Sequence, residues 1–372
     1  MTPRYAQRRA RVADALRQEG LDALALNPGP ALTYLFGHRF LLLERPILGI
    51  ITREGRSALI VPELERAAAT RVLPDGVYAY PDDPDQWAPA VTRALRELGL
   101  TQGRIGIEPN RLRVQELWLL QQAAPAARIV DAGPLLAEQR AVKDPEELAA
   151  IRRAVAVAEA AWRDLLPQWQ PGVTEAEMAR RLTVALLALG SQTELPFEPI
   201  IAFGEHAAEP HAQPGERVLV EGDLILVDWG ARVDGYVSDM TRLAILSSTV
   251  PEDLAHAATA VQDAVNAALR AARVGAPAGA VDQAARATLA AQGLADAFIH
   301  RTGHGLGLDV HEPPYLYEGN ERALQARMVF TIEPGVYLPG RWGVRWEHMV
   351  HLTDEGPEVL TQLPLDIVRL RA

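Results

Sequence analysis

The first 138 residues alternate between helical and strand-like hydrophobic patterns. An amphipathic helix is predicted over 4–19, followed by the strand "LDALAL" over 21–26. Two apolar segments, "PILGIIT" and "SALIVP", flank the polar connection "REGR" and predict a β-hairpin. Then come a helix from Glu63, the strand "GVYAYP", a helix over 85–99, the strand "GRIGIE", a helix over 111–123 and the strand "ARIVDA". This pattern predicts a small α/β domain over 1–138, with a mixed sheet covered by helices.

A second region begins at residue 139 with a strong helix signal. Asp144 suits the N-cap, Pro145 suits the first helical position, and Glu147 completes a capping box. The elements that follow are a helix between Thr174 and Gly190, strands over 195–246, two alanine-rich helices over 252–292 and strands over 328–353. These elements predict an α+β domain over 139–372. Two helices followed by strands occur twice in it, a pattern typical of a duplicated half, but the sequence identity between the halves is too weak to establish a repeat.

Composition excludes several classes of protein. Hydrophobic residues make up 48% and charged residues 23% of the 372 residues, which is ordinary for a globular protein and excludes a disordered chain. No apolar run is long enough to span a bilayer. The net charge of −11 argues against a nucleic-acid partner. The N-terminal arginines precede no apolar core, so no secretory signal is predicted and the cytoplasm is the expected location.

The absence of cysteine narrows the chemistry further. It excludes disulfides, cysteine-based zinc sites, iron–sulfur clusters and thiol nucleophiles, so any metal must be held by His, Asp and Glu. The first domain also contains no phosphate loop and no dinucleotide-binding glycine fingerprint. We therefore expect it to support or gate the second domain.

Two aspartates stand out in "DLILVDWGARVDGYVSDMTR". Asp228 ends an apolar run, and Asp239 follows 11 residues later, beyond a turn at Gly235. A hairpin would bring the two carboxylates side by side, which is unfavourable unless a proton or a cation lies between them. The alternative is a pair of solvated turn aspartates, which the β-branched residues before Asp228 disfavour.

Three histidines lie close together in "FIHRTGHGLGLDVHEPP". His300 and His304 are four residues apart, but the glycines around them make a helix improbable there. His311 follows seven residues after His304. Single histidines are usually structural, whereas three in a short glycine-rich segment favour a site. No H-E-x-x-H motif occurs, which excludes the zincin protease mechanism.

Two glutamates lie in apolar strand-like segments, "MVFTIEPGVYLPG" and "GVRWEHMVHL". Glu333 precedes a Pro-Gly turn, and Glu347 follows Trp346. A buried glutamate needs a cation, which Arg345, His348 or a metal could supply. His348 could equally be an ordinary strand residue.

Charge balance favours two metals. Four carboxylates carry a charge of −4, which two divalent cations neutralise, with a neutral imidazole filling one position. A ligand set rich in oxygen with a single imidazole favours Mn²⁺, with Co²⁺ and Zn²⁺ as alternatives. Two such ions would acidify a water enough to make it a nucleophile near neutral pH.

The order D-x₁₀-D, H, E, E, with "SDMTR", "GHGLGLDVHEPP", "TIEPGVY" and "VRWEHM", resembles the pita-bread metallopeptidases, and within them the Xaa-Pro peptidases prolidase and aminopeptidase P. The resemblance covers about 139–372, and the first 138 residues are similar to the creatinase-type N-terminal domain. It implies that Asp228 and Asp239 bind one metal, with Asp239 bridging to the second. His304 and Glu333 would complete the second metal's ligands, and Glu347 would bridge.

The resemblance also implies roles on the substrate side. Glu333 would take the proton from the attacking water, and His311 and His211 would polarise the scissile carbonyl and stabilise the oxyanion. His300 would line the proline site, and Arg345 would order the surroundings of the ligands. The expected protein is a cytoplasmic homodimer that acts on proline-containing di- or oligopeptides. Two departures from the family are His348, where Asp is common, and the loop "FGEHAAEPHA" before His211.

Several alternatives remain open at this stage. Within the fold they are a methionine aminopeptidase, a metal-free creatine-type amidinohydrolase and a non-enzymatic partner-binding protein. The first would not need the N-terminal domain, and the other two would not need all five ligands.

Dipeptidase and aminopeptidase P are harder to separate, because a dipeptidase needs a fixed cation for the substrate carboxylate, best an arginine. Arg45, in "YLFGHRFLLLERPILGI", is the candidate, with Arg39 as the second choice. Arg45 could instead pair with Glu44 or another local carboxylate. If Arg45 grips the substrate, the protein is a prolidase.

Overall fold

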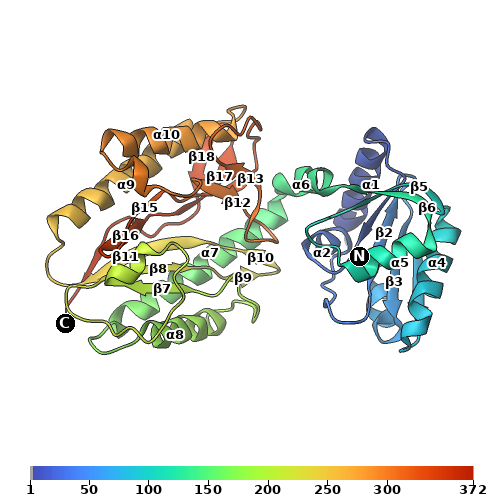
Figure 1. Ribbon diagram of the computed structural model, residues 1–372, viewed down its shortest axis with the longest axis horizontal. Coiled ribbons are helices and arrows are strands. Elements are labelled where there is room, and N and C mark those ends of the chain that lie inside the picture. Colours follow the sequence, from blue (N-terminus) through green and yellow to red (C-terminus); the bar gives the residue numbers. More distant parts are fainter. Residues whose placement is uncertain (1–2, 372) are drawn as a thin grey trace. The chain divides into compact units, whose positions relative to one another are not determined.

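Residues 3–371 are described in the computed structural model shown in Figure 1. The chain divides into two units, Met1–Arg140 and Ala141–Ala372. The expected boundary lies two residues earlier, between 138 and 139, and helix α6 (Gly133–Ala141) runs across both positions. A boundary inside a helix has no Pro/Gly-rich linker to mark it, so a sequence pattern locates it only approximately.

The N-terminal unit contains a six-stranded mixed sheet. Its strands are β1 (Ala23–Leu26), β2 (Leu48–Thr52), β3 (Ser57–Pro62), β4 (Gly76–Tyr80), β5 (Gln102–Ile107) and β6 (Ala126–Asp131), in the order β4-β3-β2-β1-β5-β6. Pairs β1–β2 and β2–β3 are antiparallel and the others are parallel. The predicted hairpin is therefore present as β2–β3, and its turn places Gly55 at φ 87°, a conformation that favours glycine.

Helices lie around this sheet, as predicted. They are α1 (Pro3–Gln18), α2 (Pro30–Phe36), α3 (Arg66–Arg71), α4 (Trp87–Leu98), α5 (Val114–Ala123) and α6, with short 3₁₀ turns η1 (Glu63–Glu65) and η2 (Pro84–Gln86). Helix α4 buries Val91, Ala94 and Leu95 in one core with strand residues such as Ile50 and Ile105. The apolar face of the helix and the buried strands thus form the hydrophobic core of this unit.

The C-terminal unit begins with the helix pair that the sequence predicts. Helices α7 (Pro145–Leu165) and α8 (Glu175–Ala188) are separated by the 3₁₀ turn η3 (Leu166–Gln168). Asp144 accepts a hydrogen bond from the Glu147 backbone N–H at 2.9 Å, and the Glu147 side chain accepts one from the Asp144 N–H at 2.8 Å. This reciprocal pair is the expected capping box.

Strands and a second helix pair make up the rest of this unit. The first strands are β7 (Ile200–Phe203), β8 (Leu224–Trp229), β9 (Arg232–Val233), β10 (Tyr236–Val237) and β11 (Met240–Leu246), with η4 (Gly204–Ala208) after β7. Helices α9 (Glu252–Ala271) and α10 (Ala278–Ala291) and η5 (Ala295–Ala297) follow. The remaining strands are β12 (Gly303–Gly305), β13 (Glu312–Leu316), β14 (Val329–Ile332), β15 (Gly335–Leu338), β16 (Trp342–Arg345), β17 (His348–Thr353), β18 (Gly356–Val359) and β19 (Val368–Leu370).

These strands form two larger sheets and two short ribbons. The larger sheets have the orders β19-β11-β8-β7 and β13-β12-β14-β17-β18, and the ribbons are β9–β10 and β15–β16. Figure 1 shows α7 and α8 on one side of the strands of this unit and α9 and α10 on the other. The two helix–strand halves therefore enclose a common core of strands, where the candidate site residues lie.

Candidate metal centre and active site

The two candidate aspartates lie on neighbouring strands. Asp228 belongs to β8 and faces Thr241 of β11 in the antiparallel register, while Asp239 immediately precedes β11. The connection between them is the short ribbon β9–β10 rather than a simple hairpin. Both aspartates are buried, and one carboxylate oxygen from each lies within 4.8 Å of the other and of one from Glu347. The predicted pairing of carboxylates is therefore present.

The electrostatics of this cluster favour the binding of a cation. Burial, followed by the charges of neighbouring carboxylates, raises the pKa of Asp239 and of Glu347 well above their ordinary values. Asp228 Oδ1 and Glu347 Oε1 are fully buried and have no hydrogen-bond partner among the described residues. Buried oxygens that lack a donor are costly, and a divalent cation would satisfy both.

His304 completes the cluster from the other sheet. Its Nδ1 lies 3.2 Å from the carbonyl oxygen of Gly305, which can only accept a hydrogen bond, so Nδ1 carries a hydrogen. Its Nε2 lies 3.1 Å from Glu333 Oε1 and 3.7 Å from Asp239 Oδ2. An imidazole nitrogen between two carboxylates, with its other nitrogen bonded to a carbonyl, is the arrangement of a metal-binding histidine.

Glu333 differs from the other carboxylates. It lies just after β14 and not inside a strand as expected, because Pro334 separates it from β15. Burial acts to raise its pKa, but the hydrogen bond and charge of His304, and the charges of His300 and Arg345, outweigh burial and lower it to about 2. Thr331 donates a hydrogen bond to Glu333 Oε1 at 3.1 Å. The carboxylate is therefore held in its ionised form.

Glycines allow His304 to approach the centre. A Cβ at Gly303 would lie 2.0 Å from the carbonyl oxygen of Thr331, and one at Gly305 would lie 2.5 Å from that of Pro313. Strand β12 therefore fits between β13 and β14 only with glycine at both positions. The expected absence of a helix around His304 is confirmed.

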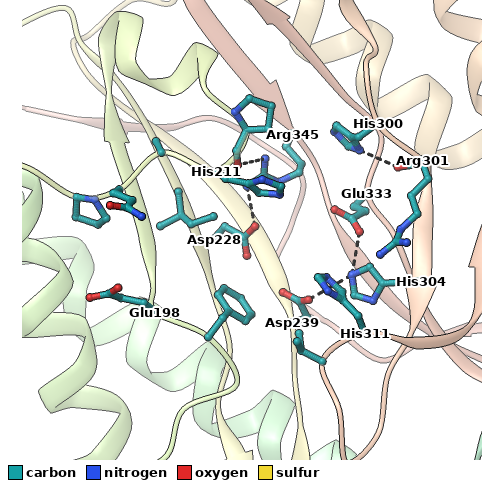
Figure 2. A pocket seen from close by; sticks show the side chains of 17 residues that line it. Glu198, His211, Asp228, Asp239, His300, Arg301, His304, His311, Glu333 and Arg345 are labelled. Carbon is teal, nitrogen blue, oxygen red and sulfur yellow. Dashed lines mark hydrogen bonds and ion pairs between the residues drawn. The ribbon is translucent and has the colours of Figure 1, made fainter. Parts of the chain in front are cut away.

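Arg345 lies beside the carboxylate cluster, and all three nitrogens of its guanidinium donate hydrogen bonds. Its guanidinium donates to Asp228 Oδ2 at 2.7 Å, Thr241 Oγ1 at 3.0 Å, Tyr337 Oη at 2.7 Å and the Pro210 carbonyl at 3.2 Å. Figure 2 shows its contact with Asp228. The arginine thus orients Asp228 as a ligand and neutralises part of its charge.

Tyr337 links this arginine to His300. Because Tyr337 Oη accepts from Arg345, its own O–H is available to donate to His300 Nε2 at 3.0 Å. His300 Nδ1 then donates to the carbonyl of Arg301 at 2.7 Å. Burial, outweighing the charge of Glu333, lowers the pKa of His300. The chain of donors holds His300 in a single orientation at the cavity wall.

Apart from Glu347 and Arg45, the candidate residues line one cavity of about 540 Å³, which is drawn in Figure 2. His211 and His311 are exposed on its wall, together with Asp228, Asp239 and Glu333. The His311 ring lies edge-on to that of His304, with centroids 4.1 Å apart. Partial burial, then the charges of His304 and Arg301, lower the pKa of His311 to about 4. Two imidazoles therefore face the space next to the carboxylates.

A buried glutamate holds the loop that carries His211. Glu175, at the start of α8, accepts hydrogen bonds from the backbone N–H groups of Phe203 at 2.8 Å and Gly215 at 3.1 Å. Its carboxylate also contacts His206 Nδ1 at 2.8 Å. These contacts anchor both ends of the loop, whose geometry the sequence left open.

Comparison with known proteins agrees with this site. A family model described as metallopeptidase family M24 matches residues 149–354, more than half of the chain. The chain belongs to this metallopeptidase family. A model of the creatinase/prolidase N-terminal domain matches residues 8–142, so the predicted two-domain pita-bread architecture is confirmed. Membership implies an enzyme that uses divalent metal ions, and the buried acidic cluster is compatible with them.

Individual relatives of this M24 chain resemble it over nearly its whole length. It is 36% identical to the probable dipeptidase PepE of Mycobacterium tuberculosis, over 98% of this chain and 96% of that protein. It is similar to the crystal structure of a dipeptidase from Pyrococcus horikoshii OT3, with 35% identity, a TM-score of 0.92 and coverage of 98% and 100%. A prolidase from Thermococcus sibiricus superposes with a TM-score of 0.93, 30% identity and coverage of 98% and 99%.

Arg45 lies in the N-terminal unit of the M24 chain, where local carboxylates hold it. Its guanidinium donates to both oxygens of Asp82, at 2.7 and 2.9 Å, and also contacts Glu44. These hydrogen bonds raise its pKa. The local pairing that the sequence left open is therefore formed, and a role for Arg45 in substrate binding stays a prediction.

His348 is an ordinary strand residue of β17. Its Nδ1 lies 2.7 Å from Thr361 Oγ1, and burial followed by the charge of Arg242 lowers its pKa to about 3. Among residues 3–371, its ring makes no hydrogen bond or ion pair with Asp228, Asp239 or Glu347, so the departure from the common Asp leaves the clustered carboxylates in place.

Sequence reasoning missed Thr241, Tyr337, Arg301 and Glu175. Thr241 and Tyr337 lie inside the quoted segments "SDMTR" and "TIEPGVY", but nothing in those letters shows that they would meet Arg345. Glu175 follows its N-cap directly and resembles any acidic residue of a first helical turn.

Among the residues described, no helix is both long and apolar enough to cross a membrane.

Proposed function

We propose that this M24 metallopeptidase is an Xaa-Pro dipeptidase, that is, a prolidase. The observation that carries the proposal is the cavity, whose wall combines the buried Asp228, one oxygen of which has no hydrogen-bond partner among the described residues, with the exposed imidazoles of His211 and His311. A site of this kind can bind cations and stabilise negative charge that develops on a peptide carbonyl. The relatives named dipeptidase and prolidase support the same reading.

We propose that five residues hold two divalent cations per subunit: Asp228, Asp239, His304, Glu333 and Glu347. The two carboxylate oxygens without partners and the orientation of His304 support this ligand set. Mn²⁺ is the expected metal because oxygen ligands dominate, with Co²⁺ and Zn²⁺ as the alternatives. Bound cations would acidify a water and polarise the scissile carbonyl.

The chain's own residues would perform the remaining steps. Glu333, ionised beside His304, would accept the proton of the attacking water and pass it to the leaving proline nitrogen. His211 and His311 would donate hydrogen bonds to the oxygen of the tetrahedral intermediate. His300, oriented by Tyr337, would contact the proline ring, and Arg345 would hold Asp228 in place.

Two measurements test the proposal. Elemental analysis of active protein should show two divalent ions per subunit, and saturation at one ion or none would contradict the ligand set. An Xaa-Pro dipeptide should be hydrolysed faster than a tripeptide of the form Xaa-Pro-Yaa. A preference for the tripeptide would favour the second candidate, aminopeptidase P.

The setting of the reaction completes the proposal. We expect a homodimer that acts in the cytoplasm on proline-containing peptides, with neither nucleic acid nor membrane as a partner. The sequence supports the exclusions through its net charge of −11 and the absence of a long apolar run.

A further inference from the structure

The side chains of two arginines line the active-site cavity, and only one of them is hydrogen-bonded to other protein groups among the described residues. Arg345 donates to four partners and is buried. Arg301 also lines the cavity but is partly exposed. Within residues 3–371, its guanidinium makes no hydrogen bond or ion pair. The guanidinium lies over the ring of Tyr315, 4.5 Å from the centroid. Arg301 therefore presents an unused cation to the cavity.

The position of Arg301 is well defined by its surroundings. The buried Asp282 accepts hydrogen bonds from the Thr302 backbone N–H at 2.9 Å and from the Thr302 hydroxyl at 2.8 Å. Arg286 donates to the carbonyl of His300 at 2.6 Å. The backbone on both sides of Arg301 is thus anchored, and the Tyr315 ring supports the guanidinium plane by a cation–π contact. Such a cation loses little conformational entropy when it binds an anion.

The charge of Arg301 acts inside the reaction site. Figure 2 shows Arg301 near Glu333 and His304, with Glu198 on the opposite side of the cavity. Arg301 lines the same cavity as His211, His304 and His311. An anionic group of the substrate bound beside these imidazoles would therefore face Arg301.

We propose that Arg301 binds the C-terminal carboxylate of the dipeptide and so determines the preference for dipeptides. This inference rests on the proposed function. In an Xaa-Pro dipeptide, the carboxylate is attached to the carbon next to the scissile nitrogen, so its partner must lie close to the residues that hold the scissile bond. Arg301 directly follows His300 and precedes His304 by three residues. A longer peptide places a neutral amide there, which leaves the arginine without its anion.

The decisive experiment compares Ala-Pro with its C-terminal amide, which has nearly the same size but no carboxylate. We expect wild-type protein to prefer the acid. Arg301→Ala should lower kcat/KM for the acid by roughly 10- to 100-fold, mainly through KM, and leave the amide almost unchanged, since one charge-assisted pair is lost. Arg301→Lys should restore part of the preference, because it retains the charge but not the bidentate geometry.

Two control variants separate this effect from a general one. Arg180→Ala removes another arginine that makes no hydrogen bond or ion pair with the described residues, from the wall of a neighbouring cavity. Arg45→Ala removes the candidate that the sequence suggested. If Arg301 is the carboxylate ligand, both variants should keep the acid-to-amide ratio of wild type. Metal content and thermal midpoint, measured for each variant, should match wild type for Arg301→Lys and Arg301→Ala.

The outcomes distinguish this inference from the proposed function. If wild type hydrolyses neither substrate, the proposed function fails. If wild type hydrolyses both equally, or if its preference for the acid survives Arg301→Ala, the role of Arg301 is wrong while the peptidase assignment stands. Loss of the preference in Arg45→Ala alone would transfer the role to Arg45.

Discussion

The two units of this protein treat buried negative charge in opposite ways. Glu116 is the buried carboxylate of the described N-terminal unit, and Arg113 of the same helix region binds both its oxygens. In the C-terminal unit, Asp228, Asp239 and Glu347 lie together, and two of their oxygens lack donors among the described residues. A carboxylate with its own arginine serves the fold, whereas carboxylates that outnumber nearby cations need ions from solution.

The same contrast exists inside the C-terminal unit. Glu312 is paired with Lys143 at 2.6 Å, and Asp282 with Arg286 at 2.6 Å. Asp239 and Glu347 instead have raised pKa values, caused by burial and by other carboxylates. Burial alone therefore does not mark the site. The excess of negative charge over available donors does.

Replacing a carboxylate in each unit gives the largest expected contrast. Glu333→Ala removes a proposed ligand and the proposed base together, so turnover should be abolished. Activity above roughly a tenth of wild type, a barrier change of only about 1.4 kcal/mol, would contradict that role. The matched variant Glu116→Gln should keep full turnover and metal content. It should cost about 1–3 kcal/mol in the free energy of unfolding, measured by denaturant titration.

The exposed imidazoles should affect rate without affecting metal binding. His211→Ala and His311→Ala should each lower kcat by about 10²–10³-fold, because each removes a donor to the developing oxyanion. Steady-state kinetics and elemental analysis on the same preparations check this. Metal lost in proportion to activity would show that the histidine is a ligand instead.

Metal removal should destabilise the protein, and more so at higher pH. Ions present at about 100 times their dissociation constant would stabilise the fold by about 2.7 kcal/mol, which chelation removes. Asp239 and Glu347 have higher pKa values in the metal-free fold than in an unfolded chain. The metal-free fold therefore binds more protons, and its stability falls as the pH rises from about 4 through those raised values.

Thermal midpoints of loaded and chelated protein at pH 5 and pH 8 measure this effect. The difference between the two forms should widen at pH 8. An equal difference at both values would mean that the buried carboxylates do not hold protons when the metal is absent. Chelation should leave the local pairing of Arg45 with Asp82, in the N-terminal unit, unaffected.

The smallest expected effect concerns the loop that carries His211. Glu175→Gln replaces one acceptor oxygen by an NH₂ donor. The side-chain amide can then no longer accept hydrogen bonds from the backbone N–H groups of both Phe203 and Gly215 through two separate oxygens. We expect kcat to fall by about tenfold, or about 1.4 kcal/mol, with KM and metal content unchanged.

Glu177→Gln is the matched control on the same helix, because Glu177 pairs with Arg181 at the surface. It should behave as wild type. Equal effects of the two substitutions would indicate that α8 is perturbed as a whole and that Glu175 does not position the loop.

Much of the fold follows from local pattern. Turn residues, helix caps and the spacing of hydrophobic residues act over a few neighbouring positions. They therefore predict the β2–β3 hairpin, the capping box at Asp144 and the alanine-rich helices α9 and α10. The candidate ligands were also identified, because their spacing resembles that of a family. The exact ends of the strands were not predicted. The apolar pattern places Glu333 and Glu347 inside strands, whereas in the structure both lie just outside them.

The sequence by itself determined which residues could bind a metal, because residue type and order decide which donors are available. Only the tertiary structure decided their partners. Arg345 meets Asp228 across 117 positions of the chain and Thr241 across 104, and no short-range pattern encodes such contacts. The same holds for the two arginines considered as carboxylate ligands. Sequence context suggested Arg45, whose role in substrate binding stays a prediction, but no short-range pattern encodes its ion pair with Asp82, 37 positions away. Nor does any such pattern show that Arg301 lines the cavity without an ion-pair partner among the described residues.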